Sequence, residues 1–92
     1  MGVETVRVEI VGRVQGVGYR AWTHRTAAKM GLAGFVRNRR DGTVEAVFQG
    51  PAETVAAMIA ACRSGPGLSR VVEVRAVPHE GSYTGFVVMA TV

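Results

Sequence analysis

The sequence predicts a two-layer α+β fold, in which two helices cover one face of a single sheet. Three observations support this. Three stretches of the 92-residue chain alternate apolar and polar residues, as half-buried strands do. Two helix-forming stretches lie between strand-forming ones. The order along the chain is strand, helix, strand, strand, helix, strand, followed by a short apolar stretch.

Local signals place the elements of the first half of the chain. The expected elements are a strand over 5–14, a helix over 21–30, and strands over 32–38 and 43–49. Val6, Val8 and Ile10 alternate with charged residues, which is typical of a half-buried strand. The first helix stretch is Ala-rich without Gly or Pro, and Gly31 after it is a natural C-cap. The pair Asp41-Gly42 favours a tight hairpin between the next two strands.

The second half repeats the pattern of helix and strand. Pro51 is expected at the first position of the second helix. An apolar stripe at i, i+3, i+4 and i+7 follows, formed by Val55, Met58, Ile59 and Cys62. Because Cys62 belongs to this stripe, we interpret it as a core residue and not a reactive thiol. A fourth strand is expected around 72–76, a turn over 78–82 and a short closing strand over 85–92.

The connections determine the topology. A tight hairpin makes the second and third strands antiparallel, while each helix links two parallel strands by a right-handed crossover. This arrangement is the ferredoxin-like βαββαβ sandwich, a mixed and mainly antiparallel sheet with both helices on one face. The short C-terminal strand adds to it, and 1–92 is expected to form a single domain.

Composition limits the classes of function. The net charge is +4, but exposed aromatic residues for base stacking are few, so we do not expect nucleic-acid binding. No apolar run reaches the length of a membrane span, and no signal peptide is visible. A single cysteine excludes an internal disulfide and a cysteine-based metal site. A cytoplasmic monomer without membrane association is expected.

A Gly-rich stretch over 12–20 links the first strand to the first helix. It holds Gly12, Gly16 and Gly18, and it ends in Arg20. Glycine turns at a helix N-terminus direct several backbone N–H groups at one point, where the helix dipole adds partial positive charge. The guanidinium of Arg20 is suited to a phosphate or a carboxylate. The stretch therefore predicts an oxyanion site; the alternative is a tight turn with one exposed arginine.

Other catalytic chemistries find little support. The run Gly16 to Ala21 fits a loose dinucleotide-binding fingerprint, but the chain is too short for that fold and its second strand ends in basic residues. His24 and His79 lack metal-ligand spacing and are interpreted as surface residues. No paired acids, nucleophile with a neighbouring base, or metal-ligand set is visible. Asn38, near the end of the second strand, is by itself either a turn residue or a functional one.

Two longer motifs resemble those of a known family. The stretch 10–20, Ile-Val-Gly-Arg-Val-Gln-Gly-Val-Gly-Tyr-Arg, resembles the first signature of the acylphosphatase family, G-x-V-Q-G-V-x-F-R, with Tyr19 where Phe is usual. The run Gly34 to Asn38, continued by Gly42-Thr43-Val44 and Gly50, resembles the second signature, and 83–86 is similar to the closing segment. The resemblance implies the same ferredoxin-like fold. It also implies hydrolysis of the carboxyl–phosphate bond of small acyl phosphates, without metal or cofactor.

The resemblance also implies residue roles. Arg20 would bind the phosphate, and Asn38 would hold the attacking water. The backbone N–H groups that would complete the phosphate cradle, which could also take a free phosphate or sulfate ion, belong to Gln15, Gly16, Val17, Gly18 and Tyr19.

Two alternatives stay open. One is a non-catalytic ferredoxin-like module that binds anions or RNA. The other is a domain of a larger protein, since similar domains begin hydrogenase-maturation carbamoyl transferases.

Overall fold

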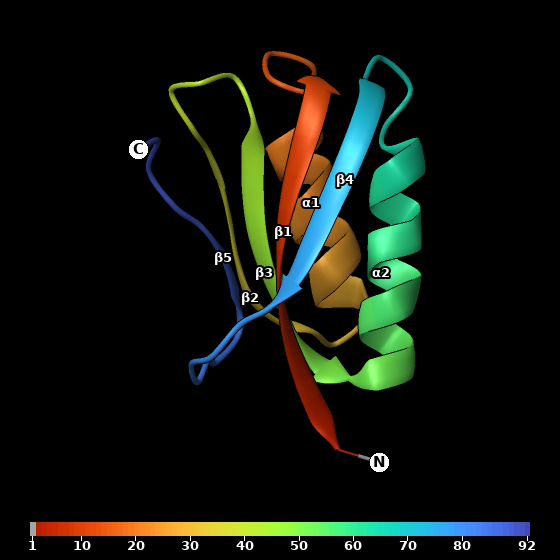
Figure 1. Ribbon diagram of the computed structural model, residues 1–92, viewed down its shortest axis with the longest axis vertical. Helices are drawn as coiled ribbons and strands as arrows, with labels where there is room; N and C mark the ends of the chain where they lie inside the picture. The colour runs from red at the N-terminus through yellow and green to blue at the C-terminus, as the bar shows by residue number, and fades with distance from the viewer. Residues whose placement is uncertain (1) are drawn as a thin grey trace.

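A five-stranded sheet forms one layer of the molecule, and both helices lie on the same face of it (Figure 1). The computed structural model describes residues 2–92. Its elements in chain order are β1 (Val3–Arg13), α1 (Tyr19–Lys29), β2 (Ala33–Asn38), β3 (Val44–Pro51), α2 (Ala52–Ser64), β4 (Arg70–Pro78) and β5 (Phe86–Val88). The predicted ferredoxin-like fold is confirmed.

Strand pairing follows the predicted topology. The order across the sheet is β4-β1-β3-β2-β5. β1 runs antiparallel to β3 and β4, and β2 runs antiparallel to β3. Each helix therefore connects two parallel strands. β5 adds to the free edge of β2 in parallel, which makes the sheet mixed.

The core fills the space between the sheet and the helices. From β1 it takes the alternating residues Val6, Val8 and Ile10, as the periodicity predicts. The apolar stripe of α2 packs against them, and Cys62 in that stripe is fully buried. Burying one such side chain contributes about 1.5–3 kcal/mol to the stability of the fold.

Several boundaries differ from expectation. α1 begins at Tyr19 and not at residue 21, because Gly18 takes a left-handed conformation (φ 80°) and serves as its N-cap. Pro51 is not the first residue of α2. It is the last residue of β3, where it pairs with Val3, and its extended backbone (ψ 139°) makes it the N-cap of the helix. Gly12 lies inside β1 at a β-bulge rather than in the loop, and a Cβ there would clash with the carbonyl of Arg70.

The C-terminal strand is shorter than the predicted 85–92. β5 covers only Phe86–Val88, and β4 continues to Pro78 at the start of the expected turn. After β5 the backbone still follows β2: Met89 N–H donates to the Val36 carbonyl at 2.9 Å, and Val92 N–H donates to the Asn38 carbonyl at 3.2 Å. The tail therefore lies beside the end of β2.

Neither helix described within residues 2–92 combines the length and apolar character that a membrane span requires.

Candidate active site

The loop between β1 and α1 has the geometry of an anion cradle. Gly16 (φ 74°) and Gly18 (φ 80°) both adopt a left-handed conformation that other residues rarely take, although a Cβ at either position would meet no atom within 4 Å. The first helical hydrogen bond, from Trp22 N–H to the Gly18 carbonyl, is 3.0 Å long. No side chain caps the α1 N-terminus, and its first turn contains no acid. The N–H groups of this turn and the helix dipole can therefore serve an external anion.

A cavity of about 320 Å³ opens at this loop. The residues that line it come from the loop, the first turn of α1, the end of β2 and β5, and are Val14, Gly16, Gly18, Tyr19, Arg20, Ala21, Asn38 and Val88. Arg20 and Asn38 are 18 residues apart in sequence and line the same cavity. Of the residues predicted from sequence, this cavity also takes Gly16, Gly18 and Tyr19.

Among residues 2–92, Arg20 is the only charged one that lines the cavity. It is half-buried, and none of the ion pairs within residues 2–92 includes it. Its guanidinium charge is therefore not neutralised by a neighbouring carboxylate. A planar, permanently charged fork beside unpaired helix N–H groups is suited to bind a phosphate.

Asn38 contributes a buried polar atom to the same cavity. It lies on the helix-covered face of the sheet, in register with Val44 of β3. Its side-chain Oδ1 is buried and accepts no hydrogen bond from any residue within 2–92. Leaving a buried acceptor unpaired costs about 1–3 kcal/mol, so such an atom points to a partner outside the protein.

Gln15 and Val17 lie in the same loop but do not line the cavity. The Val17 side chain packs, partly buried, against the core. The Gln15 side chain points to the β2–β3 hairpin, where Nε2 donates to the carbonyls of Arg39 and Thr43 at 2.8 Å each. The structure therefore does not bring Gln15 and Val17 into the cavity wall, and the contribution of their backbone N–H groups to the phosphate cradle stays a prediction.

Tyr19 joins the loop to the core. Its ring is fully buried, and its hydroxyl donates to the Cys62 carbonyl in the last turn of α2 at 2.7 Å. Burial, then the neighbouring Cys62, raise the pKa of Tyr19, so this hydroxyl remains a neutral donor. The hydroxyl that distinguishes Tyr from the usual Phe thus has a hydrogen-bond partner within the core.

Sequence reasoning missed three apolar wall residues, which are Val14, Ala21 and Val88. Val14 lies within the Gly-rich stretch over 12–20 and Ala21 directly follows it, so their proximity to the motif is a signal in the sequence. Val88 carries no such signal, because it reaches the site only through the parallel pairing of β5 with β2.

The remaining reactive side chains lie elsewhere. His79 is exposed, whereas His24, expected at the surface, is half-buried with its ring centre 6.3 Å from that of Phe86. Burial raises the pKa of the Cys62 thiol to about 11, which agrees with a core role. No group of three or more His, Cys, Asp or Glu residues within 2–92 is arranged to hold a metal ion.

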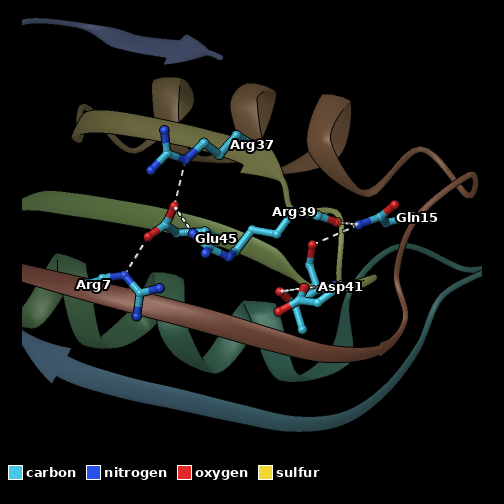
Figure 2. A network of polar contacts seen from close by, with 7 residues as sticks. Arg7, Gln15, Arg37, Arg39, Asp41 and Glu45 are labelled. Carbon is cyan, nitrogen blue, oxygen red and sulfur yellow. Dashed lines mark hydrogen bonds and ion pairs between the residues drawn. The ribbon is translucent and has the colours of Figure 1, made fainter. Parts of the chain in front are cut away.

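Arg37 and Arg39, the two basic residues that flank Asn38, form ion pairs with Glu45 and do not line the cavity. Arg37 and Arg39 reach the Glu45 carboxylate at 2.6 Å and 3.3 Å, and Arg7 reaches it at 2.5 Å. Figure 2 shows the side chains of this cluster. Glu45 lies on the face of the sheet opposite the helices, because it alternates with inward-facing Val44 and Ala46. These arginines therefore form an ion-pair cluster on the outer face.

Comparison with known proteins identifies the family. The acylphosphatase family model matches residues 6–88. An acylphosphatase of Azorhizobium caulinodans is 57% identical over 90 residues, which cover 96% of this chain and 97% of that protein. The structure of an acylphosphatase from Bacillus subtilis superposes with a TM-score of 0.89 at 31% identity, over 96% of this chain and 99% of that one. One from Coxiella burnetii has a TM-score of 0.91 at 27% identity, over 95% and 93%. The chain therefore belongs to the acylphosphatase family and is an enzyme that hydrolyses acyl phosphates.

Proposed function

We propose that the cavity at the β1–α1 loop is the active site, in which Arg20 binds the phosphate group of an acyl phosphate. The backbone N–H groups from Gln15 to Tyr19 complete the phosphate cradle. Asn38 holds the attacking water. The left-handed glycines, the uncapped helix and the unpaired guanidinium support the cradle.

The reaction needs little from the protein beyond positioning and charge stabilisation. A water oxygen bonds to phosphorus while the bond from phosphorus to the bridging oxygen breaks. The leaving carboxylate takes the electron pair of that bond and needs no proton. The proton of the water passes to a phosphate oxygen of the substrate, which explains how the site works without a general base. Fixed donors at the phosphate then supply the electrostatic part of catalysis.

The observation that carries the proposal is the buried, unpaired Oδ1 of Asn38 in the same cavity as Arg20. A neutral amide can accept a hydrogen bond from a water and donate one to it at the same time, without adding negative charge beside a phosphate dianion. The shared cavity, in which Arg20 is the one charged residue lining the wall within residues 2–92, supports a water-orienting role for Asn38.

Hydrolysis of benzoyl phosphate by the wild type and Asn38→Ala tests this proposal. Because Asn38 holds the water and not the phosphate, kcat should fall about 10²–10³-fold, while inorganic phosphate still inhibits with nearly its normal Ki. Asn38→Asp should be no better, because it adds negative charge beside the phosphate. If the Ki rises in parallel with the loss of kcat in a folded Asn38→Ala, then Asn38 binds phosphate and the water-holding role is wrong.

The same assay with excess EDTA tests the metal-free mechanism. Within residues 2–92 the cavity wall offers one cation and one amide but no carboxylate, imidazole or thiol ligand. Turnover should therefore be unchanged by EDTA. Loss of activity that a divalent ion restores would contradict the mechanism.

We further propose that the enzyme acts as a monomer in the cytoplasm. Arg20, Asn38 and the glycines of the loop lie together within this one fold, which supports a site that a single copy can form. The single cysteine is a buried free thiol, which suits a reducing compartment.

A further inference from the structure

The side chain of Gln15 connects the phosphate loop to the element that carries Asn38. Its Nε2 donates to two carbonyls, those of Arg39 and Thr43, both at 2.8 Å (Figure 2). Both N–H hydrogens of the amide are therefore used. The two carbonyls lie on opposite arms of the β2–β3 hairpin, and Arg39 directly follows Asn38. One side chain thus bridges the loop to both arms of the hairpin.

The hairpin is itself firmly held. Arg39 N–H donates to the Thr43 carbonyl at 2.9 Å, and the Asp41 carboxylate accepts bonds from the Thr43 N–H and hydroxyl at 2.9 Å and 2.6 Å. These bonds from Thr43 hold the pKa of Asp41 below its ordinary value. The Arg39 guanidinium also reaches Glu45 at 3.3 Å. Gln15 is therefore anchored to a turn that several hydrogen bonds and an ion pair hold together.

We propose that Gln15 is a positioning residue, whose side chain fixes the separation between the phosphate cradle and Asn38. This inference rests on the proposed function, in which the loop holds the phosphate and Asn38 holds the water. In-line attack requires the two to be aligned, and a misplacement of about 1 Å can cost about 10²-fold in rate. Two donors on a neutral side chain suit this contact, because its partners are two carbonyl oxygens.

Gln15→Met is the direct test, because methionine keeps the length of the side chain and removes both donors. The chain offers a matched control in Gln49, on the opposite end of β3 from the hairpin. The Nε2 of Gln49 also donates two bonds of 2.8 Å, to the Thr5 hydroxyl and to the Gly81 carbonyl. Gln49→Met removes these and a third bond, from Tyr83 N–H, so it is a stringent control for stability.

Both variants should lower the midpoint of urea unfolding, and Gln49→Met at least as much as Gln15→Met. Only Gln15→Met should lower kcat for benzoyl phosphate, by about tenfold or more, while the Ki of inorganic phosphate changes much less. The inference is overturned if kcat is equal in the two variants. It is also overturned if the Ki rises by the same factor as kcat falls, since Gln15 would then shape the cradle alone.

Gln15→Glu adds a readout that a purely structural role would not change. A carboxylate cannot donate to the two carbonyls, whereas the protonated acid can donate once. The kcat of Gln15→Glu relative to wild type should therefore rise as pH falls from 7 to 5, while the ratio for Gln15→Met stays flat. A flat ratio for both variants contradicts the inference, as does a phosphate Ki that follows the ratio, which would indicate charge repulsion alone.

These outcomes separate the two proposals. If Arg20→Ala and Asn38→Ala keep normal turnover, the proposed function is wrong. If both are inactive while Gln15→Met behaves like Gln49→Met, only the role of Gln15 is wrong.

Discussion

Arg20 combines two properties that suit a phosphate ligand, a charge without an ion-pair partner within residues 2–92 and a position at the helix start. Because no other charged residue lines the cavity, its loss has no substitute within residues 2–92. We expect Arg20→Ala to lower kcat/KM for benzoyl phosphate about 10²–10³-fold and to weaken inhibition by phosphate. Arg20→Lys should also be poor, because a point charge does not reproduce a two-pronged donor.

Arg25→Ala is the matched control for this prediction. Arg25 lies on the same helix, is exposed, and does not line the cavity, so its removal changes the net charge equally. Its kinetic parameters should stay near those of the wild type. Near-normal turnover in a folded Arg20→Ala, or an equal loss in Arg25→Ala, would contradict the assignment of Arg20.

For single residues, the sequence predicted that Arg20 and Asn38 belong to one site but not where every side chain points. Arg20 and Asn38 were expected to act together, and both line one cavity. The direction of the Gln15 side chain could not be predicted, because its partners lie 24 and 28 residues away and depend on the finished fold. The hydroxyl of Tyr19 likewise finds its acceptor 43 residues away.

Helix and strand ends show why element boundaries were less certain than element types. The helix predicted over 21–30 is present, but the left-handed Gly18 allows α1 to start two residues earlier, at Tyr19. Proline is compatible with the first position of a helix and also with the end of a strand. In the structure Pro51 pairs with Val3 of β1, so it ends β3. The tail over 89–92 was expected in a strand because it is apolar, but only β5 itself pairs as one.

β5 places one of two neighbouring valines in the cavity wall. Val87 and Val88 are 50% and 49% exposed, yet only Val88 lines the cavity. We expect Val88→Lys to lower the preference for benzoyl phosphate over succinyl phosphate, because the acyl group would meet a cation instead of an apolar wall. A change of about tenfold in the ratio of kcat/KM values is expected from the loss of one apolar contact.

Val87→Lys is the control, since it adds the same charge at the adjacent position on the opposite face. Its ratio of kcat/KM values for the two substrates should match that of the wild type. If both lysine variants shift the ratio equally, the acyl group does not contact Val88 and the effect is one of overall charge.

For the whole molecule, the sequence predicted the layers but not the outer face of the sheet. The fold class follows from local signals that agree with one another, the strand periodicity, the hairpin turn and the helix stripe. The cluster around Glu45 depends instead on strand register. Arg37 lies directly opposite Glu45 on β2, whereas Arg7 lies on β1 opposite Val47 and reaches Glu45 diagonally. No pattern within one strand indicates this meeting.

The Glu45 cluster joins three strands and gives stability a predictable dependence on pH. The carboxylate is nearly buried, with 6% of its side chain exposed, while its arginine partners are 23–34% exposed. Burial raises the pKa of Glu45, but the hydrogen bonds and charges of Arg37 and Arg7 outweigh burial and hold the pKa below its ordinary value of 4.5. A carboxyl whose pKa is lowered by folding stabilises the fold above its unfolded pKa. That stabilisation is lost as pH falls through the folded value.

We therefore expect Glu45→Gln to be less stable than the wild type at pH 7 by about 1–3 kcal/mol, since it leaves three guanidinium groups without their anion. The difference should shrink as pH falls below 4.5, the ordinary pKa, because the wild-type carboxyl then also becomes neutral. Urea unfolding of both proteins at pH 7 and near pH 3 measures this difference.

Glu73→Gln is the control, because it removes only an exposed pair with Arg75 at 2.9 Å, a kind of pair that contributes about 0.2–1 kcal/mol. A gap between wild type and Glu45→Gln that is equally large at both pH values would mean that the amide substitution perturbs packing, and that the ionised carboxylate is not what holds the three strands together.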